Sequence, residues 1–176
     1  RLMTKVWPDE FSNLSVDVEI RFDSLASARP NAQLLGGNRI GLFAAPGLVG
    51  VVPRGGLDPE EICAHPLIQV VGTADSWQDW ARAQGVSAPL RPAIFVDSYG
   101  TAVDLARSGA GIALASASIA APCINDATLV AVSPAMTPAS DGYHLSVNAD
   151  AVSDMPARFA AWLQDEVARA EASAIP

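Results

Sequence analysis

The sequence predicts an α/β fold in which strands and helices alternate around a largely parallel sheet. Short apolar runs that read as strands alternate with segments that carry helix caps and helical spacing of apolar residues. Half of the 176 residues are hydrophobic, so the chain can bury a core of the size that a folded domain needs.

The first strands and the first helix have clear local signals. Residues 17–22 alternate apolar and charged side chains, which is typical of a half-buried strand. A second strand is expected over residues 39–45, after a Gly-Gly-Asn turn. A short helix begins at Asp58, before a proline and two acidic residues, and ends near His65.

Two further pairs of elements follow in the middle of the chain. A buried strand is expected over residues 67–71, and a helix begins after Asp75 and ends at Gly85. The next strand, residues 94–96, leads directly into a helix at Asp97-Ser98. This direct passage from strand to helix is typical of an α/β sheet.

The second half of the chain continues the alternation. The expected elements are a strand at 112–116, a short helix at 118–123, strands at 128–132 and 143–147, and a long amphipathic helix from Ser153 to about residue 170. The proline-containing loop 133–142 is a candidate crossover between two lobes.

Composition narrows the classes of function. The formal net charge is −8 and the basic residues are scattered, so we do not expect this chain to hold DNA by itself. No apolar run reaches the ~20 residues of a membrane span, which predicts a soluble chain. Cys63 and Cys123 lie far apart without metal spacing, so we expect two reduced, buried thiols and neither a metal site nor a cofactor.

The sequence lacks the usual enzymatic signatures. Ser98 lies in Asp-Ser-Tyr-Gly and not in the Gly-x-Ser-x-Gly elbow of a hydrolase. His65 and His144 read as structural residues, and the Gly-Ala-Gly at 109–111 reads as a helix stop and not as a phosphate loop. We expect no enzyme; a small α/β hydrolase that uses Ser98 is the least favoured alternative.

A binding site is best predicted where the 94–96 strand meets its helix. The free backbone N–H groups and positive dipole end of a helix suit an anion. The residues concerned are Asp97, Ser98, Tyr99, Gly100 and Thr101, and Thr73 could add a hydroxyl from the end of a neighbouring strand. Alternatively, Ser98 or Asp97 merely caps the helix, and the two roles can coexist.

Six segments resemble sequence motifs of one protein family and follow one another in the same order as in that family. They are DVEIRF, LLGGNRIGLFAAPGLV, LDPEEICAHPLI, WQDWARAQG, VDSYGTAVDLARSGAGIAL and ARFAAWLQDEV. Together they resemble the effector-binding domain of LysR-type transcriptional regulators over nearly the whole chain. Within that family, the chain most resembles the subgroup that regulates glycine-cleavage and β-lactamase genes.

The resemblance implies two Rossmann-like lobes joined by crossover strands, as in type 2 periplasmic binding proteins. The first lobe would comprise residues 1–43 and 142–176, and the second lobe residues 44–141. In the family, a winged helix-turn-helix, a linker helix and the first strand and helix of the sensing domain come before the point where this sequence begins. Residues 2–6 resemble the second strand of that domain, so the first lobe is expected to be truncated at its N-terminus.

Site residues on the opposite side of the cleft also follow from the resemblance. It points to Trp7 and Asp9, at the end of a first-lobe strand, and to Arg21, whose planar fork could hold an acidic effector. Two alternatives are open. Trp7 could pack between the lobes, and Arg21 could pair with Asp23 or Glu19.

The implied function is that of a sensor. A small anionic effector would bind in the cleft and change the activity of a DNA-binding domain that lies outside this sequence. The chain would contact promoter DNA only through that domain. The family further implies a cytoplasmic protein, without a membrane, that forms homodimers or tetramers. A periplasmic solute-binding protein for transport is the alternative from another class.

Overall fold

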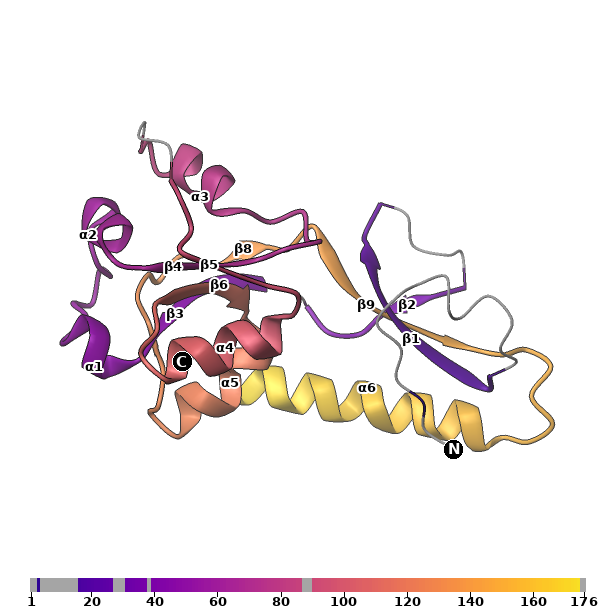
Figure 1. Cartoon of the computed structure of the whole chain (residues 1–176). Helices are drawn as coiled ribbons and strands as arrows, with labels where there is room; N and C mark the ends of the chain where they lie inside the picture. The colour runs from indigo at the N-terminus through magenta and orange to yellow at the C-terminus, as the bar shows by residue number, and fades with distance from the viewer. Residues whose placement is uncertain (1–2, 4–15, 27–30, 38, 87–89, 175–176) are drawn as a thin grey trace.

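The computed structural model describes residues 3, 16–26, 31–37, 39–86 and 90–174, with side chains to residue 170. The strands are β1 (Val18–Ser24), β2 (Gln33–Leu34), β3 (Arg39–Ala44), β4 (Leu67–Val70), β5 (Ile94–Val96), β6 (Ile112–Ser116), β7 (Val130–Ala131), β8 (Thr137–Pro138) and β9 (Asp141–Val147). The helices are α1 (Pro46–Val49), α2 (Pro59–Ala64), α3 (Trp77–Ala83), α4 (Tyr99–Arg107), α5 (Ala117–Asn125) and α6 (Met155–Ala174). They form two sheets with helices beside them (Figure 1).

The larger sheet has six strands in the order β5-β4-β6-β3-β7, with β8 paired to β3. β4 is parallel to both β5 and β6, as the alternation of strands and helices predicts. β3 is antiparallel to β6, β7 and β8, so the sheet is mixed and not largely parallel. The chain enters this sheet at β3 and leaves it at β8. These two strands are antiparallel, so one leads from the smaller sheet and the other leads back to it.

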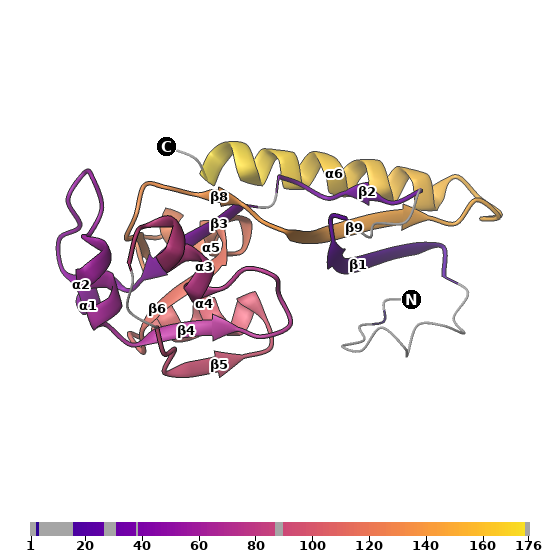
Figure 2. The same cartoon turned by 90° about the horizontal axis from the view of Figure 1, so that it is seen from above.

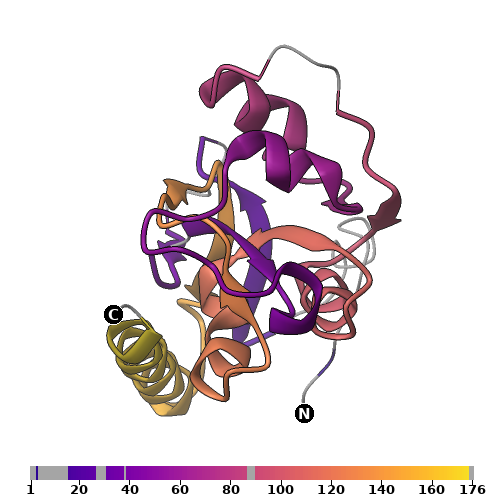
Figure 3. The same cartoon turned by 90° about the vertical axis from the view of Figure 1, so that its left-hand side faces the viewer.

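Helices cover both faces of the larger sheet. α2 and α3 lie on one face, and α4 and α5 lie on the other (Figure 1, Figure 3). Ser76 is the N-cap of α3 and accepts the Asp79 N–H at 3.1 Å, so the helix begins one residue later than a cap at Asp75 would place it. α4 ends at Arg107 and Gly109 follows with a φ of 83°, which confirms the predicted glycine stop.

The smaller sheet consists of β9 between β1 and β2, both antiparallel to it. β9 follows β8 closely, so the returning chain passes from the larger sheet into the smaller one (Figure 2). α6 runs beside the smaller sheet, contacts β9 and extends as far as α5 of the larger half (Figure 1, Figure 2).

The hydrophobic core lies in the larger half. Its large side chains with almost no exposure are Trp77, Phe43, Leu42, Ile62, Ile68, Ile112, Leu129 and Val132. β6 also approaches the chain before β4 closely, because Ile112 N–H donates to the Pro66 carbonyl at 2.8 Å and a Cβ on Gly111 would lie 2.4 Å from that oxygen. A glycine is therefore required at position 111.

The boundaries of several predicted elements change. α1, β2 and β8 were not expected, and β9 begins at Asp141 within the predicted crossover loop. Among the described strands, residues 39–43, which we assigned to the first lobe, pair with those of the larger sheet. The division of the chain at 43/44 and 141/142 otherwise stays a prediction. The strand expected at residues 2–6 lies outside the described residues, apart from residue 3.

Two further expectations concern cysteines and membranes. Cys63 and Cys123 are free and half-buried, which is less burial than we expected. Burial raises the pKa of the Cys63 thiol, and the charge of Glu60 acts in the same direction. None of the described helices is both long enough and apolar enough to cross a membrane.

Candidate functional site

The predicted binding junction lies at the edge of the larger sheet where β4 and β5 end side by side. Val70 pairs with Val96, and Val71 N–H donates to the Val96 carbonyl at 2.8 Å. Thr73 and residues 97–101 therefore leave the sheet at the same edge, the carboxyl ends of two parallel strands. The structure brings these predicted residues into one neighbourhood, although β4 and β5 are separated in sequence by a whole helix.

Ser98 caps α4. Its hydroxyl oxygen accepts the Thr101 N–H at 3.2 Å, and the Ser98 and Thr101 hydroxyls are 2.9 Å apart. The capping role is confirmed, while an effector contact at Ser98 stays a prediction. Asp97, Ser98, Gly100 and Thr101 are exposed, and a Cβ on Gly100 would meet nothing within 4 Å, so a ligand can reach the first turn of α4.

Tyr99 differs from its neighbours because it is only 4% exposed. Its ring contacts Phe22 of β1 edge-on, with centroids 5.9 Å apart, and Phe22 contacts Tyr143 of β9 at 5.1 Å. These three rings connect the first turn of α4 to the smaller sheet. Phe22 and Tyr143 were not predicted as site residues, because contacts between such distant segments leave no mark in local sequence patterns.

The Tyr99 hydroxyl is buried and makes no hydrogen bond within the described part of the chain. Burial raises the pKa of this phenol, and the charge of Asp75 adds to the increase. The phenol is therefore protonated at neutral pH and can donate a hydrogen bond. The Thr73 hydroxyl lies 3.2 Å from the Val70 carbonyl and 3.3 Å from the Asp75 carbonyl, within donating distance of both backbone oxygens.

Arg21 pairs with Glu19, which is one of the two alternatives open at the sequence level. Its Nε donates to Glu19 Oε1 at 2.5 Å, and both side chains are largely covered. The two residues lie two apart on a strand, so their side chains share one face of β1. An effector contact at Arg21 stays a prediction, and such a contact would have to coexist with this ion pair.

A set of hydrogen bonds joins the loop after β4 to the start of β9. Ala74 N–H donates to Asp141 Oδ2 at 2.7 Å, and the Ser140 N–H and hydroxyl lie 3.4 Å from the Asp75 carboxylate. Asp141 is only 6% exposed. Burial raises the pKa of Asp75, and the neighbouring charge of Asp141 adds to it. We missed these residues because Asp141-Gly142 has the local signal of a turn.

The remaining predicted contacts are not part of this arrangement. Trp7 and Asp9 lie outside the described residues. Within the described ranges, no group of three His, Cys, Asp or Glu side chains could hold a metal ion. A pocket of about 250 Å³ does occur in the larger half, but it lies beside α3, and neither Thr73 nor residues 97–101 line it.

Comparison with protein families identifies the family of this chain. The family model described as the LysR substrate binding domain matches residues 8–168. The chain belongs to this family. LysR substrate-binding domains are the effector-sensing parts of transcription regulators and not enzymes, so the alternatives of a hydrolase and of a transport protein are set aside. A comparison with curated proteins gives no significant match.

Solved LysR-type structures share the fold. The AmpR effector binding domain from Citrobacter freundii is 20% identical with a TM-score of 0.71, covering 94% of this chain and 80% of that one. The effector domain of AmpR of Pseudomonas aeruginosa is 21% identical with a TM-score of 0.68, covering 87% and 73%. CrgA from Neisseria meningitidis, a LysR-type transcriptional regulator, is 19% identical with a TM-score of 0.63, covering 86% and 52%. The α/β fold of LysR effector-binding domains, which we predicted, is confirmed.

Proposed function

We propose that this LysR substrate-binding domain senses a small anionic metabolite in a cleft between its two lobes. One observation carries the proposal: the first turn of α4 and the end of β4 share an edge of the larger sheet, and Tyr99 connects that edge to β1 through Phe22. Exposed N–H groups at the start of a nine-residue helix favour a carboxylate or similar anion.

The roles of single residues follow from this arrangement. Residues 98–101 would bind the anion through backbone N–H groups and the Ser98 and Thr101 hydroxyls, with Asp97 at the rim. Tyr99 would donate from its buried phenol, and Thr73 would close the floor. Arg21 would attract the anion from the smaller sheet, and Trp7 and Asp9 would complete that side.

A ligand that contacts both lobes favours the lobe placement in which both sets of contacts form. We infer that this bias reaches a helix-turn-helix DNA-binding domain in the complete regulator, which works in the cytoplasm as a homodimer or tetramer on promoter DNA. We further propose that the chain belongs to the subgroup that regulates glycine-cleavage and β-lactamase genes, which its sequence most resembles.

A thermal-unfolding screen tests the anion preference. The probes are a panel of small carboxylates, each paired with its primary amide at equal concentration. A carboxylate at 100 times its Kd should raise Tm by roughly 5–10 °C, while its amide should give little change. Amides that stabilise the protein as well as the acids do would contradict the proposal.

A matched pair of variants locates the site. Asp is as good a helix cap as Ser, so Ser98→Asp keeps the start of α4 but places a negative charge where the anion would bind. Gln78→Glu adds the same charge to the exposed first turn of α3. Carboxylate binding should be lost in Ser98→Asp and kept in Gln78→Glu, and equal affinity in both variants would place the site elsewhere.

A further inference from the structure

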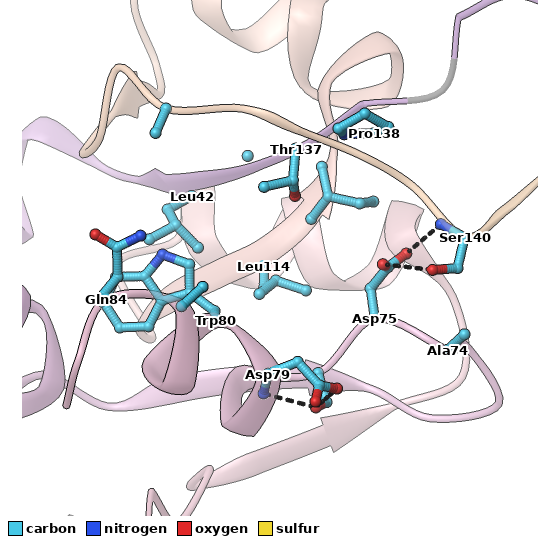
Figure 4. Close-up of a pocket in the computed structure, with 15 residues that line it drawn as sticks. Leu42, Ala74, Asp75, Asp79, Trp80, Gln84, Leu114, Thr137, Pro138 and Ser140 are labelled. Atoms are coloured by element: carbon cyan, nitrogen blue, oxygen red, sulfur yellow. Dashed lines mark hydrogen bonds between the residues drawn. The ribbon is translucent and has the colours of Figure 1, made fainter. Parts of the chain in front are cut away.

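The pocket beside α3 lies on the face of the larger sheet that α2 and α3 cover. It has a volume of about 250 Å³ and is bounded by α3, β3, β6 and the returning segment at residues 135–140 (Figure 4). α4 covers the opposite face of this sheet (Figure 1). Neither Thr73 nor residues 97–101 line the pocket, although Asp75 on its rim also acts electrostatically on Tyr99.

The floor and one wall of this pocket are apolar. Leu42 and Leu114 form the floor, and the Trp80 indole forms a wall (Figure 4). Trp80 contacts Trp77 edge-on with ring centroids 5.4 Å apart. Trp77 is fully buried and its Nε1 donates to the Ile68 carbonyl at 2.8 Å. Since its neighbour is fixed, the Trp80 ring presents a defined face to a ligand.

The charged side chains that line the pocket all carry the same sign. They are Asp75 and Asp79, and the fifteen lining residues include no Lys, Arg or His. Asp79 is paired with Arg82 at 2.7 Å on the exposed side of α3. The partners of Asp75 in the described residues are the Ser140 N–H and hydroxyl, both at a long 3.4 Å. The Asp75 carboxylate therefore has unused capacity to accept strong hydrogen bonds.

The surroundings of Asp75 disfavour its negative charge. Burial raises the pKa of this carboxyl, and the charges of Asp141 and Asp79 act in the same direction. A cation bound beside Asp75 would compensate that charge, whereas an anion would add to the repulsion. The chemistry of the pocket therefore selects for a positively charged guest.

We propose that this pocket binds a small organic cation, an alkylammonium or alkylguanidinium. Its charged head pairs with Asp75, and its aliphatic chain lies on Leu42 and Leu114 against the Trp80 ring. A cation within about 6 Å of an indole face gains further attraction. The volume of about 250 Å³ leaves room for a short aliphatic chain.

Binding there would also touch the connection between the two halves. Thr137, Pro138 and Ser140 line the pocket, and they belong to the segment that leads from the larger sheet into β9. A cation bound between α3 and this segment stabilises the conformation of the segment in which the pocket is formed. The site can thus change the affinity of the protein for other ligands that depend on the same connection.

Calorimetric titration with n-butylamine tests the proposal on the whole chain at pH 7 and low salt. The neutral n-butanol and the anionic butyrate have the same chain length and are the matched ligands. Saturable binding of butylammonium is expected, with no saturable binding of the other two. Added salt should weaken the binding, because part of the attraction is an ion pair. Binding of butanol or butyrate with similar affinity, or no saturable binding of butylammonium, would overturn the proposal.

Variants then locate the bound cation. Asp75→Asn should weaken butylammonium binding at least tenfold, and Asp79→Asn a few fold. Asp104→Asn, on the exposed face of α4, removes one carboxylate far from the pocket and should leave the affinity unchanged. Unchanged affinity in Asp75→Asn would show that the cation binds elsewhere.

A further substitution tests the apolar wall independently of Asp75. Trp80→Leu retains an apolar side chain but removes the ring, and should weaken butylammonium binding severalfold while the thermal transition remains cooperative. Full affinity in both Trp80→Leu and Asp79→Asn would overturn the assignment.

Discussion

The two halves of the molecule differ in how much apolar surface they bury. Phe43, in the larger sheet, has no exposed surface, whereas Phe159 on α6 is 44% exposed. Beside the smaller sheet, the buried apolar side chains Leu145 and Ala160 lie outside the main core. Several large apolar side chains of that half are exposed: Ile20, Leu34, Tyr143, Val147, Met155, Phe159 and Trp162. Stability should therefore be concentrated in the larger half.

The largest expected effect compares one aromatic residue from each half. Phe43→Ala should lower the free energy of unfolding by about 3–5 kcal/mol, because it leaves a cavity in a fully packed core. Phe159→Ala should cost about 1 kcal/mol or less, since much of that ring is already in water. Urea unfolding followed by circular dichroism measures both values, and equal losses would show that stability is shared between the halves.

The next effect concerns the connection between the halves. Asp141→Ala leaves the Ala74 N–H without its acceptor and should cost about 1–3 kcal/mol. Asp141→Asn keeps an oxygen that can accept this bond and should cost less. Urea unfolding of the two variants gives the difference, and hydrogen exchange at the Ala74 amide reports the bond directly. An equal loss in both variants would mean that the charge, and not the bond to Ala74, matters.

Helix capping gives a smaller effect within the larger half. Ser98→Ala and Ser76→Ala should each cost about 1 kcal/mol, because each removes the hydroxyl that accepts an N–H in the first turn of α4 or α3. Only Ser98→Ala should also weaken carboxylate binding. A loss of carboxylate binding in Ser76→Ala would move the proposed anion site to α3.

The smallest expected effect is on the pH dependence of Tm, and it has opposite signs for the neighbouring carboxyl groups of Asp75 and Asp79. The folded-state pKa of Asp75 is raised, mainly by burial, so its ionisation costs stability as the pH rises from the unfolded pKa to the folded one. Asp75→Asn should therefore raise Tm at neutral pH but not at pH values below both pKa values. The pKa of Asp79 is lowered by the Ser76 hydroxyl and Arg82, so its contribution is present at neutral pH and is lost on acidification.

Asp79→Asn should accordingly lower Tm at neutral pH, and the difference from the wild type should shrink as the pH falls below the ordinary carboxyl pKa towards the lowered folded-state one. Thermal unfolding between pH 3 and pH 7 measures both variants in one series. Shifts of the same sign in the two variants would show that the charges of this loop act together and not through their separate surroundings.

Sequence patterns predicted the strands of the larger sheet best. The strands at 67–71, 94–96 and 112–116 were placed to within one residue, because each is a short apolar run bounded by turn residues or caps. β2 and β8 have two residues each and α1 has four, which is too short for any periodic signal. The start of β9 was missed since an Asp-Gly pair has the same local signal whether the aspartate is exposed or buried.

The residues of the candidate site also differ in how well the sequence predicted them. The Ser98 junction was found because strand, cap and helix follow one another in the sequence. The Glu19 partner of Arg21 was foreseen as an alternative, since residues two apart on a strand share a face. The contact between Tyr99 and Phe22, and the bond between Ala74 and Asp141, join segments that are distant in sequence. No local pattern encodes such pairs.

α6 has a mechanical consequence for any movement of the lobes. Its 20 residues span about 30 Å at 1.5 Å each, and it contacts both β9 and α5. If α6 turned with the smaller sheet, a rotation of about 5° would carry its far end sideways by about 2.6 Å over that length. The packing of α5 against α6 would then have to shift. A small rotation at one end of the helix thus becomes a displacement at the other end that could change contacts with a neighbouring molecule.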